Sequence, residues 1–156
     1  MSGQFYFVSN QYFEDFSDPY LMKNKESLSG TFHDRPCFFA FPDSKCSKLL
    51  WLVPVSSKVE KYKSEYQKKC DKYGYCNTIY FCDFLGQERA FLIQNMFPVV
   101  ESYLSDIYID VFTQKSVQLR SKDQKKLIRH AKNVLKAHRQ KKKIIFVNVD
   151  LIQKQL

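Results

Sequence analysis

Several features are missing from this 156-residue sequence, and each absence excludes a class of protein. No apolar run approaches the roughly 18 residues that a membrane-spanning helix needs. The N-terminus has neither a basic stretch nor a long apolar segment, so we expect no signal peptide and a cytoplasmic location by default. Neither G-x-x-x-x-G-K-S/T nor G-x-G-x-x-G occurs, which excludes the common nucleotide-binding motifs.

The cysteines and histidines do not form a metal-binding pattern. Five cysteines are present without a C-x-x-C pair, and the spacing of six between Cys70, Cys76 and Cys82 suits no familiar zinc site. The three histidines are scattered along the chain. We therefore expect reduced thiols, as in a cytosolic protein, and neither a metal ion nor another cofactor.

Acidic residues are almost absent from one segment, which concentrates the positive charge. The formal net charge is +9, yet residues 1–113 carry 12 Lys/Arg against 14 Asp/Glu. Residues 115–143 carry 12 Lys/Arg against Asp123 alone. Such a cluster predicts a polyanionic partner, with nucleic acid favoured over a membrane surface.

The length and the hydrophobic fraction of 44% predict one globular domain over residues 1–156. Alternating or wholly apolar runs predict strands at 5–8, 37–41, 48–55, 78–84, 89–94, 107–111 and 144–147. Helical patterns cover 9–16, 57–73, the segment from Ser121 to His138, and 149–153, while 17–35 reads as an irregular loop. This order predicts an α+β fold in which helices are inserted into a curved, mostly antiparallel sheet, typical of a partly closed barrel.

The run 48–55 is apolar on both alternations, which predicts a strand buried on both faces. It ends in Ser56, Ser57 and Lys58, two hydroxyls and a cation on a rigid element, a combination suited to gripping a phosphate. Alternatively, Ser56 or Ser57 caps the following helix, and Glu60 lies three residues after Ser57 as a capping box requires. Both can hold together, because a helix N-terminus also attracts anions.

The helix that starts at Ser121 has one apolar face and one basic face. Residues Leu127, Ala131 and Leu135 follow the helical period, and a solvated opposite face would normally mix acidic with basic residues. Here it carries a run of like charges that a bound polyanion would relieve. We expect these residues to bind RNA: Lys122, Lys125, Lys126, Arg129, Lys132, Lys136 and Arg139.

Two residues before the strand at 37–41 are further candidates. Arg35 could clamp a phosphate bidentately, and His33 could move a proton near neutral pH or simply be solvated in a loop. Aromatic rings in the charged region could also stack on unpaired bases. The candidates for stacking are Tyr62, Tyr66, Tyr73 and Tyr75.

Four segments together resemble a known family. They are Asp-Arg-Pro-Cys-Phe-Phe at 34–39, Leu-Leu-Trp-Leu-Val-Pro-Val-Ser-Ser-Lys at 49–58, Asp-Phe-Leu-Gly at 83–86 and Arg-Ala-Phe-Leu-Ile-Gln-Asn-Met-Phe-Pro at 89–98. They resemble the toxins of type III toxin–antitoxin systems, and most closely the CptN branch, relatives of ToxN and AbiQ. The resemblance covers most of the chain.

The resemblance implies a curved antiparallel sheet like that of the MazF and Kid toxins. It also implies a metal-independent endoribonuclease that cleaves cellular or phage RNA. A repeated pseudoknot antitoxin RNA, which the toxin processes from its precursor, inhibits such proteins directly. Protein and RNA assemble into closed complexes, and many such systems abort phage infection.

The resemblance also implies roles for residues. Ser56 and Ser57 match the hydroxyl pair of the family's active site, Ser57 taking the more important role. The family lysine follows the pair after a proline, whereas Lys58 follows Ser57 directly, so Lys61 stays a competitor. Arg35 stands where the family has a lysine, and His33 has no counterpart.

Two rival functions fit the same sequence. A non-catalytic RNA-binding protein could use the basic helix at 121–143 alone. A peripheral membrane protein could use residues 120–143, although we expect no membrane partner. Cleavage of RNA in the presence of EDTA separates an endoribonuclease from both.

Overall fold

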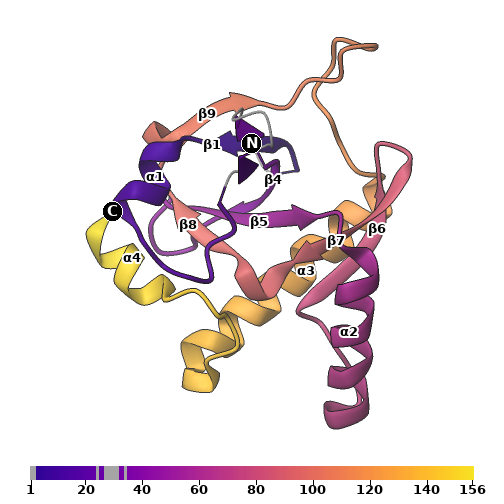
Figure 1. The fold of residues 1–156 in the computed structure, drawn as a ribbon. Coiled ribbons are helices and arrows are strands. Elements are labelled where there is room, and N and C mark those ends of the chain that lie inside the picture. The colour runs from indigo at the N-terminus through magenta and orange to yellow at the C-terminus, as the bar shows by residue number, and fades with distance from the viewer. Residues whose placement is uncertain (1–2, 24, 27–31, 34) are drawn as a thin grey trace.

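The computed structural model describes residues 3–23, 25–26, 32–33 and 35–156, which Figure 1 shows as a ribbon. Its strands are β1 Phe5–Val8, β2 Lys25–Glu26, β3 Phe32–His33, β4 Cys37–Pro42, β5 Leu50–Ser56, β6 Ile79–Phe84, β7 Gln87–Leu92, β8 Phe97–Val99 and β9 Leu104–Ile107. Its helices are α1 Asn10–Asp15, α2 Val59–Tyr73, α3 Ser121–Ala137 and α4 Val149–Gln155, with the short turns η1 Ile93–Asn95, η2 Glu101–Tyr103 and η3 His138–Lys142.

Seven strands form one antiparallel sheet. The order is β6-β7-β5-β4-β1-β9, and β8 pairs with β5 beside β7. Among the described residues β6 and β9 are not paired with one another, so the sheet is open rather than closed into a barrel. The predicted α+β fold with a mostly antiparallel sheet and inserted helices is confirmed, whereas the expected partial closure into a barrel is not seen in the described part of the chain.

Strand β5 lies in the middle of this sheet. It pairs with β4 on one side, while on the other side Leu50–Leu52 pairs with β8 and Val55–Ser56 with β7. All of its residues after Leu50 are buried, as the apolar run predicts for a strand covered on both faces. Because it is clamped from both sides, β5 holds its last residue in a fixed place.

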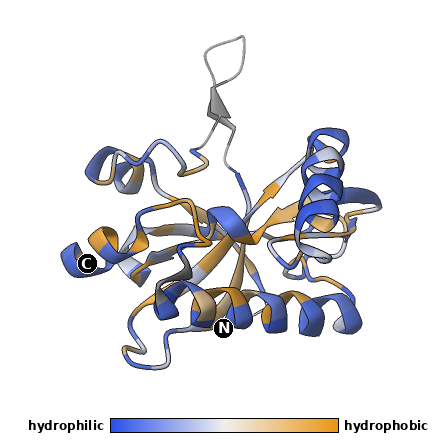
Figure 2. Cartoon of the chain, turned by 90° about the horizontal axis from the view of Figure 1, so that it is seen from below, coloured by the Kyte–Doolittle hydropathy of each residue, from blue (hydrophilic) through white to orange (hydrophobic). Residues whose placement is uncertain are grey.

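The β6–β7 hairpin separates two layers (Figures 1 and 2). Ile79, Ala90 and Leu92 pack with Tyr62 of α2, whereas Cys82 and the other alternate side chains join the main core. The apolar face of α3 packs in that same main core. Helices α2 and α3 therefore cover opposite faces of this part of the sheet.

The strand predicted at 107–111 is displaced toward the N-terminus. Strand β9 ends at Ile107, where Tyr6 of β1 is its partner. Beyond that point the chain leaves the sheet edge and closes a loop through the bridge between Ile109 and Ser116. Val111 is largely exposed, so the apolar residues there belong to a loop and not to a strand of the sheet.

The strand predicted at 144–147 is wrong. Phe146 donates one backbone hydrogen bond to Gln94 at 2.8 Å, and no ladder forms around it. Ile145 and Val147 are nevertheless buried, so the alternation correctly indicated which side chains point inward. The predicted loop at 17–35 contains a small hairpin of β2 and β3, and residues 27–31 lie outside the described part.

Candidate functional site

The end of β5 forms a sharp junction with α2. Ser56 is buried, and its Oγ accepts a hydrogen bond from the backbone N–H of Lys58 at 3.2 Å. Ser57 and Lys58 are exposed beyond it. The predicted capping box is wrong: Lys58 is the N-cap residue, and among the described residues no side-chain capping bond forms there.

Arg35 reaches the same junction from the neighbouring strand. Cys37 lies opposite Pro54 in the β4–β5 register, so the chain two residues earlier arrives beside Ser56. The Nη1 of Arg35 donates to the carbonyl oxygen of Val55 at 2.7 Å. Burial lowers the pKa of this guanidinium from its ordinary value. A guanidinium nevertheless stays charged in proteins, so a cation is held at the end of β5.

The remaining two candidates, Lys61 and His33, are less closely tied to this junction. Lys61 is exposed one turn into α2, and its Nζ lies 5.2 Å from the centroid of the Tyr62 ring. His33 pairs its backbone with Lys25 in the small hairpin, and its imidazole lies outside the described part of the structure. The junction therefore brings together Arg35, Ser56, Ser57 and Lys58, with Lys61 one helical turn away.

The basic face of α3 contains one continuous stripe. Lys122, Lys125, Arg129, Lys132 and Lys136 are all exposed and follow spacings of three and four residues, which places them along one side of the helix. The stripe is about 21 Å long at the helical rise of 1.5 Å per residue. Such a row suits a run of backbone phosphates.

Two predicted members stand outside this stripe. Lys126 is half-buried on another side of the helix. Arg139 donates through Nη2 to the Oδ1 of Asp43 at 2.6 Å, and its guanidinium lies 5.8 Å from the Trp51 ring centroid. The Nε1 of Trp51 donates to the same carboxylate oxygen at 2.9 Å. Arg139 thus fastens the end of α3 to the sheet.

The stripe and the junction lie on opposite faces of the sheet. Ser56 is paired with Ala90, whose side chain packs on the α2 side. Directly opposite residues of an antiparallel pair share a face, so Ser56 faces the α2 side as well. Helix α3 lies on the other side, at the bottom of Figure 2.

The four tyrosines proposed as stacking platforms differ in position. Tyr62 is buried against the β6–β7 hairpin, and Tyr66 packs edge-on against Phe81. Tyr73 and Tyr75 are exposed at the far end of α2. Only the second pair can stack on a ligand without rearranging the core.

A polar cluster that the sequence did not predict lies beneath that end of α2. The Nζ of Lys69 donates to the Oγ1 of Thr78 at 2.9 Å and to the Oε1 of Gln94. Thr78 and Gln94 are buried polar residues at the edges of apolar runs, and that mismatch was the available signal.

Other expected features can be described briefly. All five cysteines are free thiols. Among the described residues no three His, Cys, Asp or Glu side chains cluster in a way that could hold a metal ion. In the same part of the chain, no helix has the length and apolarity needed to cross a membrane.

No protein-family profile matches this sequence, and no curated protein sequence matches it. Its fold, however, is similar to the solved structure of AbiQ, a lactococcal anti-phage endoribonuclease belonging to the type III toxin–antitoxin system. The TM-score is 0.69, and the match covers 99% of this chain and 96% of AbiQ. The two sequences are 13% identical, so the match establishes a shared fold.

Proposed function

We propose that this chain is an endoribonuclease toxin of a type III toxin–antitoxin system, acting as a single domain. The observation that carries the proposal is the match with AbiQ over nearly the whole of both chains. The junction supports it independently, because Arg35 is bonded to the end of β5 and the exposed Ser57 and Lys58 follow directly after it. The sequence segments at 49–58 and 89–98 favour the CptN branch of the family.

The proposed reaction needs no metal ion. The 2′-hydroxyl oxygen of the RNA attacks the adjacent phosphorus while the bond from phosphorus to the 5′-oxygen breaks. The proton of the 2′-hydroxyl leaves to a base, and the 5′-oxygen takes up a proton, so the products are a 2′,3′-cyclic phosphate and a 5′-hydroxyl. The protein supplies in-line positioning and stabilisation of charge on the phosphorane.

The residues of the junction divide these tasks. Ser57, exposed at the strand end, orients the nucleophile or donates to a phosphate oxygen. Lys58 and Arg35 stabilise the developing negative charge, with Lys61 as the competing lysine. Ser56 shapes the turn through its bond to the Lys58 N–H. His33 is the candidate for the general base.

A repeated pseudoknot antitoxin RNA is the proposed inhibitor and is processed by the toxin. The stripe on α3 is the proposed contact for its phosphates, because its five exposed cations follow one another along one side of the helix. The stripe faces away from the junction, so one RNA that uses both surfaces must pass around the sheet or reach a second protein. That arrangement favours the closed protein–RNA assembly of the family.

The test uses the purified full-length chain and a mixed-sequence RNA in buffer with EDTA. We expect cleavage products with 2′,3′-cyclic phosphate ends from the wild-type protein, and a loss of about 100-fold or more in Ser57→Ala. Ser64→Ala is the matched control, because Ser64 is an exposed serine of α2. RNA that is bound but left intact by the wild-type protein would instead establish a non-catalytic RNA-binding protein.

A further inference from the structure

A cavity of about 330 Å³ lies between the C-terminal end of α2, the start of β6 and the segment after η3. Its lining includes Lys69, Tyr73, Tyr75, Thr78, Lys143 and Phe146. This lining contains two lysines and no acidic residue. Its charge therefore favours an anionic ligand.

Lys69 is half-buried at this cavity. Its ammonium donates to Thr78 and Gln94, and it lies 5.3 Å from the centroid of the Phe146 ring. Burial lowers the pKa of this ammonium, while the charge of Glu65 acts in the opposite direction. Among the described residues no carboxylate oxygen lies within ion-pair distance of Lys69, so a bound anion would be its direct charge partner.

Aromatic rings gather around the same cavity. Tyr73 is 61% exposed, Tyr75 65% and Phe146 45%. The rings of Tyr20 and Phe146 contact each other with their centroids 5.7 Å apart, which supports Phe146 from its other side. Exposed rings beside cations are the usual means of holding unpaired bases together with their phosphates.

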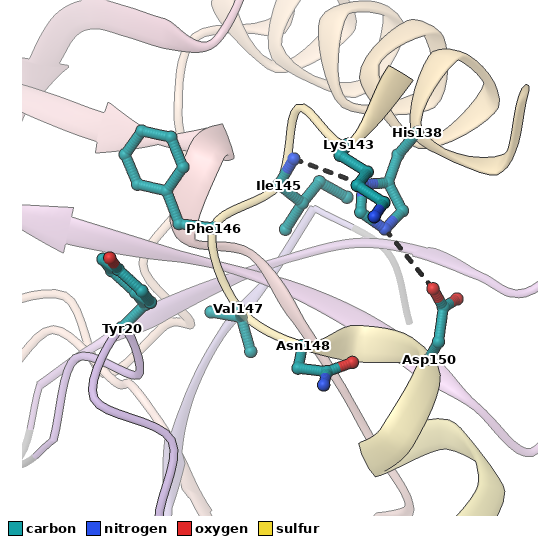
Figure 3. A pocket seen from close by; sticks show the side chains of 8 residues that line it. All are labelled: Tyr20, His138, Lys143, Ile145, Phe146, Val147, Asn148 and Asp150. Carbon is teal, nitrogen blue, oxygen red and sulfur yellow. Dashed lines mark hydrogen bonds and ion pairs between the residues drawn. The ribbon is translucent and has the colours of Figure 1, made fainter. Parts of the chain in front are cut away.

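Figure 3 shows the neighbouring hollow on the other side of Phe146, where Tyr20 and Asp150 also contribute to the lining. Asp150 is exposed there and faces the imidazole of His138 at 3.8 Å. A carboxylate at this position disfavours a phosphate. The cavity beside Lys69 is therefore the better nucleotide site.

We propose that this cavity binds one unpaired nucleotide of the RNA substrate, and this inference rests on the proposed function. The base stacks on Tyr75 or Phe146, and its phosphate lies between Lys69 and Lys143. Both ends of α2 are then used: the junction at its N-terminus positions the cut, and the cavity at its C-terminus selects a flanking base.

The separation fits a single strand. Lys58 and Lys69 are about 17 Å apart along the helix axis. At the 3.4 Å spacing of a stacked strand this is no more than about five nucleotides. Tyr62 and Lys69 both point from α2 toward the β6–β7 hairpin and its neighbours, so a strand that joins the two sites must run along the exposed side of the helix.

The test measures binding without cleavage. The probes are fluorescein-labelled eight-nucleotide RNAs of mixed sequence in which 2′-O-methyl groups remove the nucleophile. We expect the dissociation constant to rise about tenfold or more in Phe146→Ala and in Tyr75→Ala, because each loses a stacking surface. Phe112→Ala is the matched control, since Phe112 is 93% exposed on a distant loop, and we expect its dissociation constant to stay within twofold.

The contribution of Lys143 to phosphate binding is tested separately. Lys143→Ala should lower the slope of log K against log salt by about 0.7, as expected for one phosphate contact on a single strand. If Phe146→Ala unfolds, Tyr75→Ala still tests the stacking contact, because Tyr75 contributes little to the core. Wild-type protein that does not bind the probes, or variants that bind as the wild type does, would overturn the proposed site.

These outcomes are independent of the cleavage assay. If the wild-type protein cleaves RNA and Tyr75→Ala and Phe146→Ala bind the probes unchanged, the proposed nucleotide site is excluded and the proposed endoribonuclease activity is supported. If these variants bind the probes more weakly and the wild-type protein does not cleave RNA, the nucleotide site is supported and the endoribonuclease activity is excluded.

Discussion

The Nη1 of Arg35 donates to the carbonyl oxygen of Val55 at 2.7 Å, one residue before Ser56. The bond joins the segment leading into β4 to the end of β5, and the Nε of the same guanidinium donates to the carbonyl oxygen of Lys23 at 3.5 Å. A positive charge is therefore held near the proposed scissile phosphate by a backbone group that no side-chain substitution removes.

Loss of this charge should slow the chemical step. In Arg35→Gln the shorter side chain keeps an amide donor, but no charge remains to stabilise the phosphorane. We expect kcat to fall about 100-fold with little change in KM. Single-turnover cleavage of a defined RNA measures the step directly.

Arg89→Gln is the control for Arg35→Gln, because Arg89 lies on the β6–β7 hairpin and its guanidinium donates to its sequence neighbours Glu88 and Gln87. Its cleavage rate should match the wild type. An Arg35→Gln protein with wild-type kcat and an unchanged melting temperature would remove Arg35 from the active site.

The two candidate lysines should separate on substitution. Lys58 adjoins Ser57 at the N-terminus of α2, while the ammonium of Lys61 lies over the Tyr62 ring. We expect Lys58→Met to lower kcat about 100-fold and Lys61→Met to lower it less than threefold. Parallel rate measurements on the same RNA decide the order, and the reverse order would assign the role to Lys61.

Much of the fold could be predicted because β5 and α3 have strong local patterns. The apolar run at 48–55 and the apolar stripe from Leu127 to Leu135 each indicate one element and one buried face. The strand predicted at 144–147 was wrong because an alternating pattern indicates which side chains are buried and not whether the backbone pairs with another strand. Whether a neighbouring strand with free N–H and C=O groups is present depends on the rest of the chain.

The candidate site could be predicted only where its residues are adjacent in sequence. Ser56, Ser57 and Lys58 form a short run, but the approach of Arg35 to Val55 depends on the register of β4 against β5. The contact of Lys69 with Gln94 joins residues 25 positions apart across α2 and the sheet. Composition carries no information about such pairs.

Asp43 should be important for stability. Its carboxylate is fully buried and accepts from Trp51 and Arg139. Asp43→Asn leaves Arg139 without its charge partner and should lower the free energy of unfolding at neutral pH by about 3 kcal/mol. Urea denaturation of the wild type and variant measures the difference.

The effect of Asp43 should depend on pH in a defined direction. Burial raises the pKa of its carboxyl, but the hydrogen bonds from Trp51, Arg139 and the Lys45 N–H outweigh burial, so the pKa lies below its ordinary 3.8. A lowered pKa stabilises the folded state above pH 3.8, and this contribution is lost as pH falls toward the folded-state pKa. The difference between wild type and Asp43→Asn should therefore narrow below about pH 4. A difference that is constant from pH 7 to pH 3 would contradict the ionic role.

The separation of the α3 stripe from the junction allows RNA holding and RNA cleavage to be uncoupled. Charge reversal of Lys125, Arg129 and Lys132 removes the centre of the stripe on the face opposite Ser56. We expect antitoxin RNA to bind at least 100-fold more weakly in low salt, with a smaller salt dependence, while cleavage of a short single-stranded RNA changes less than threefold. The control reverses three exposed lysines that lie apart from one another: Lys48, Lys68 and Lys154. Because both triple variants change the net charge equally, weakening confined to the α3 variant locates the antitoxin on this helix, whereas equal weakening in both would reduce the stripe to a general electrostatic effect.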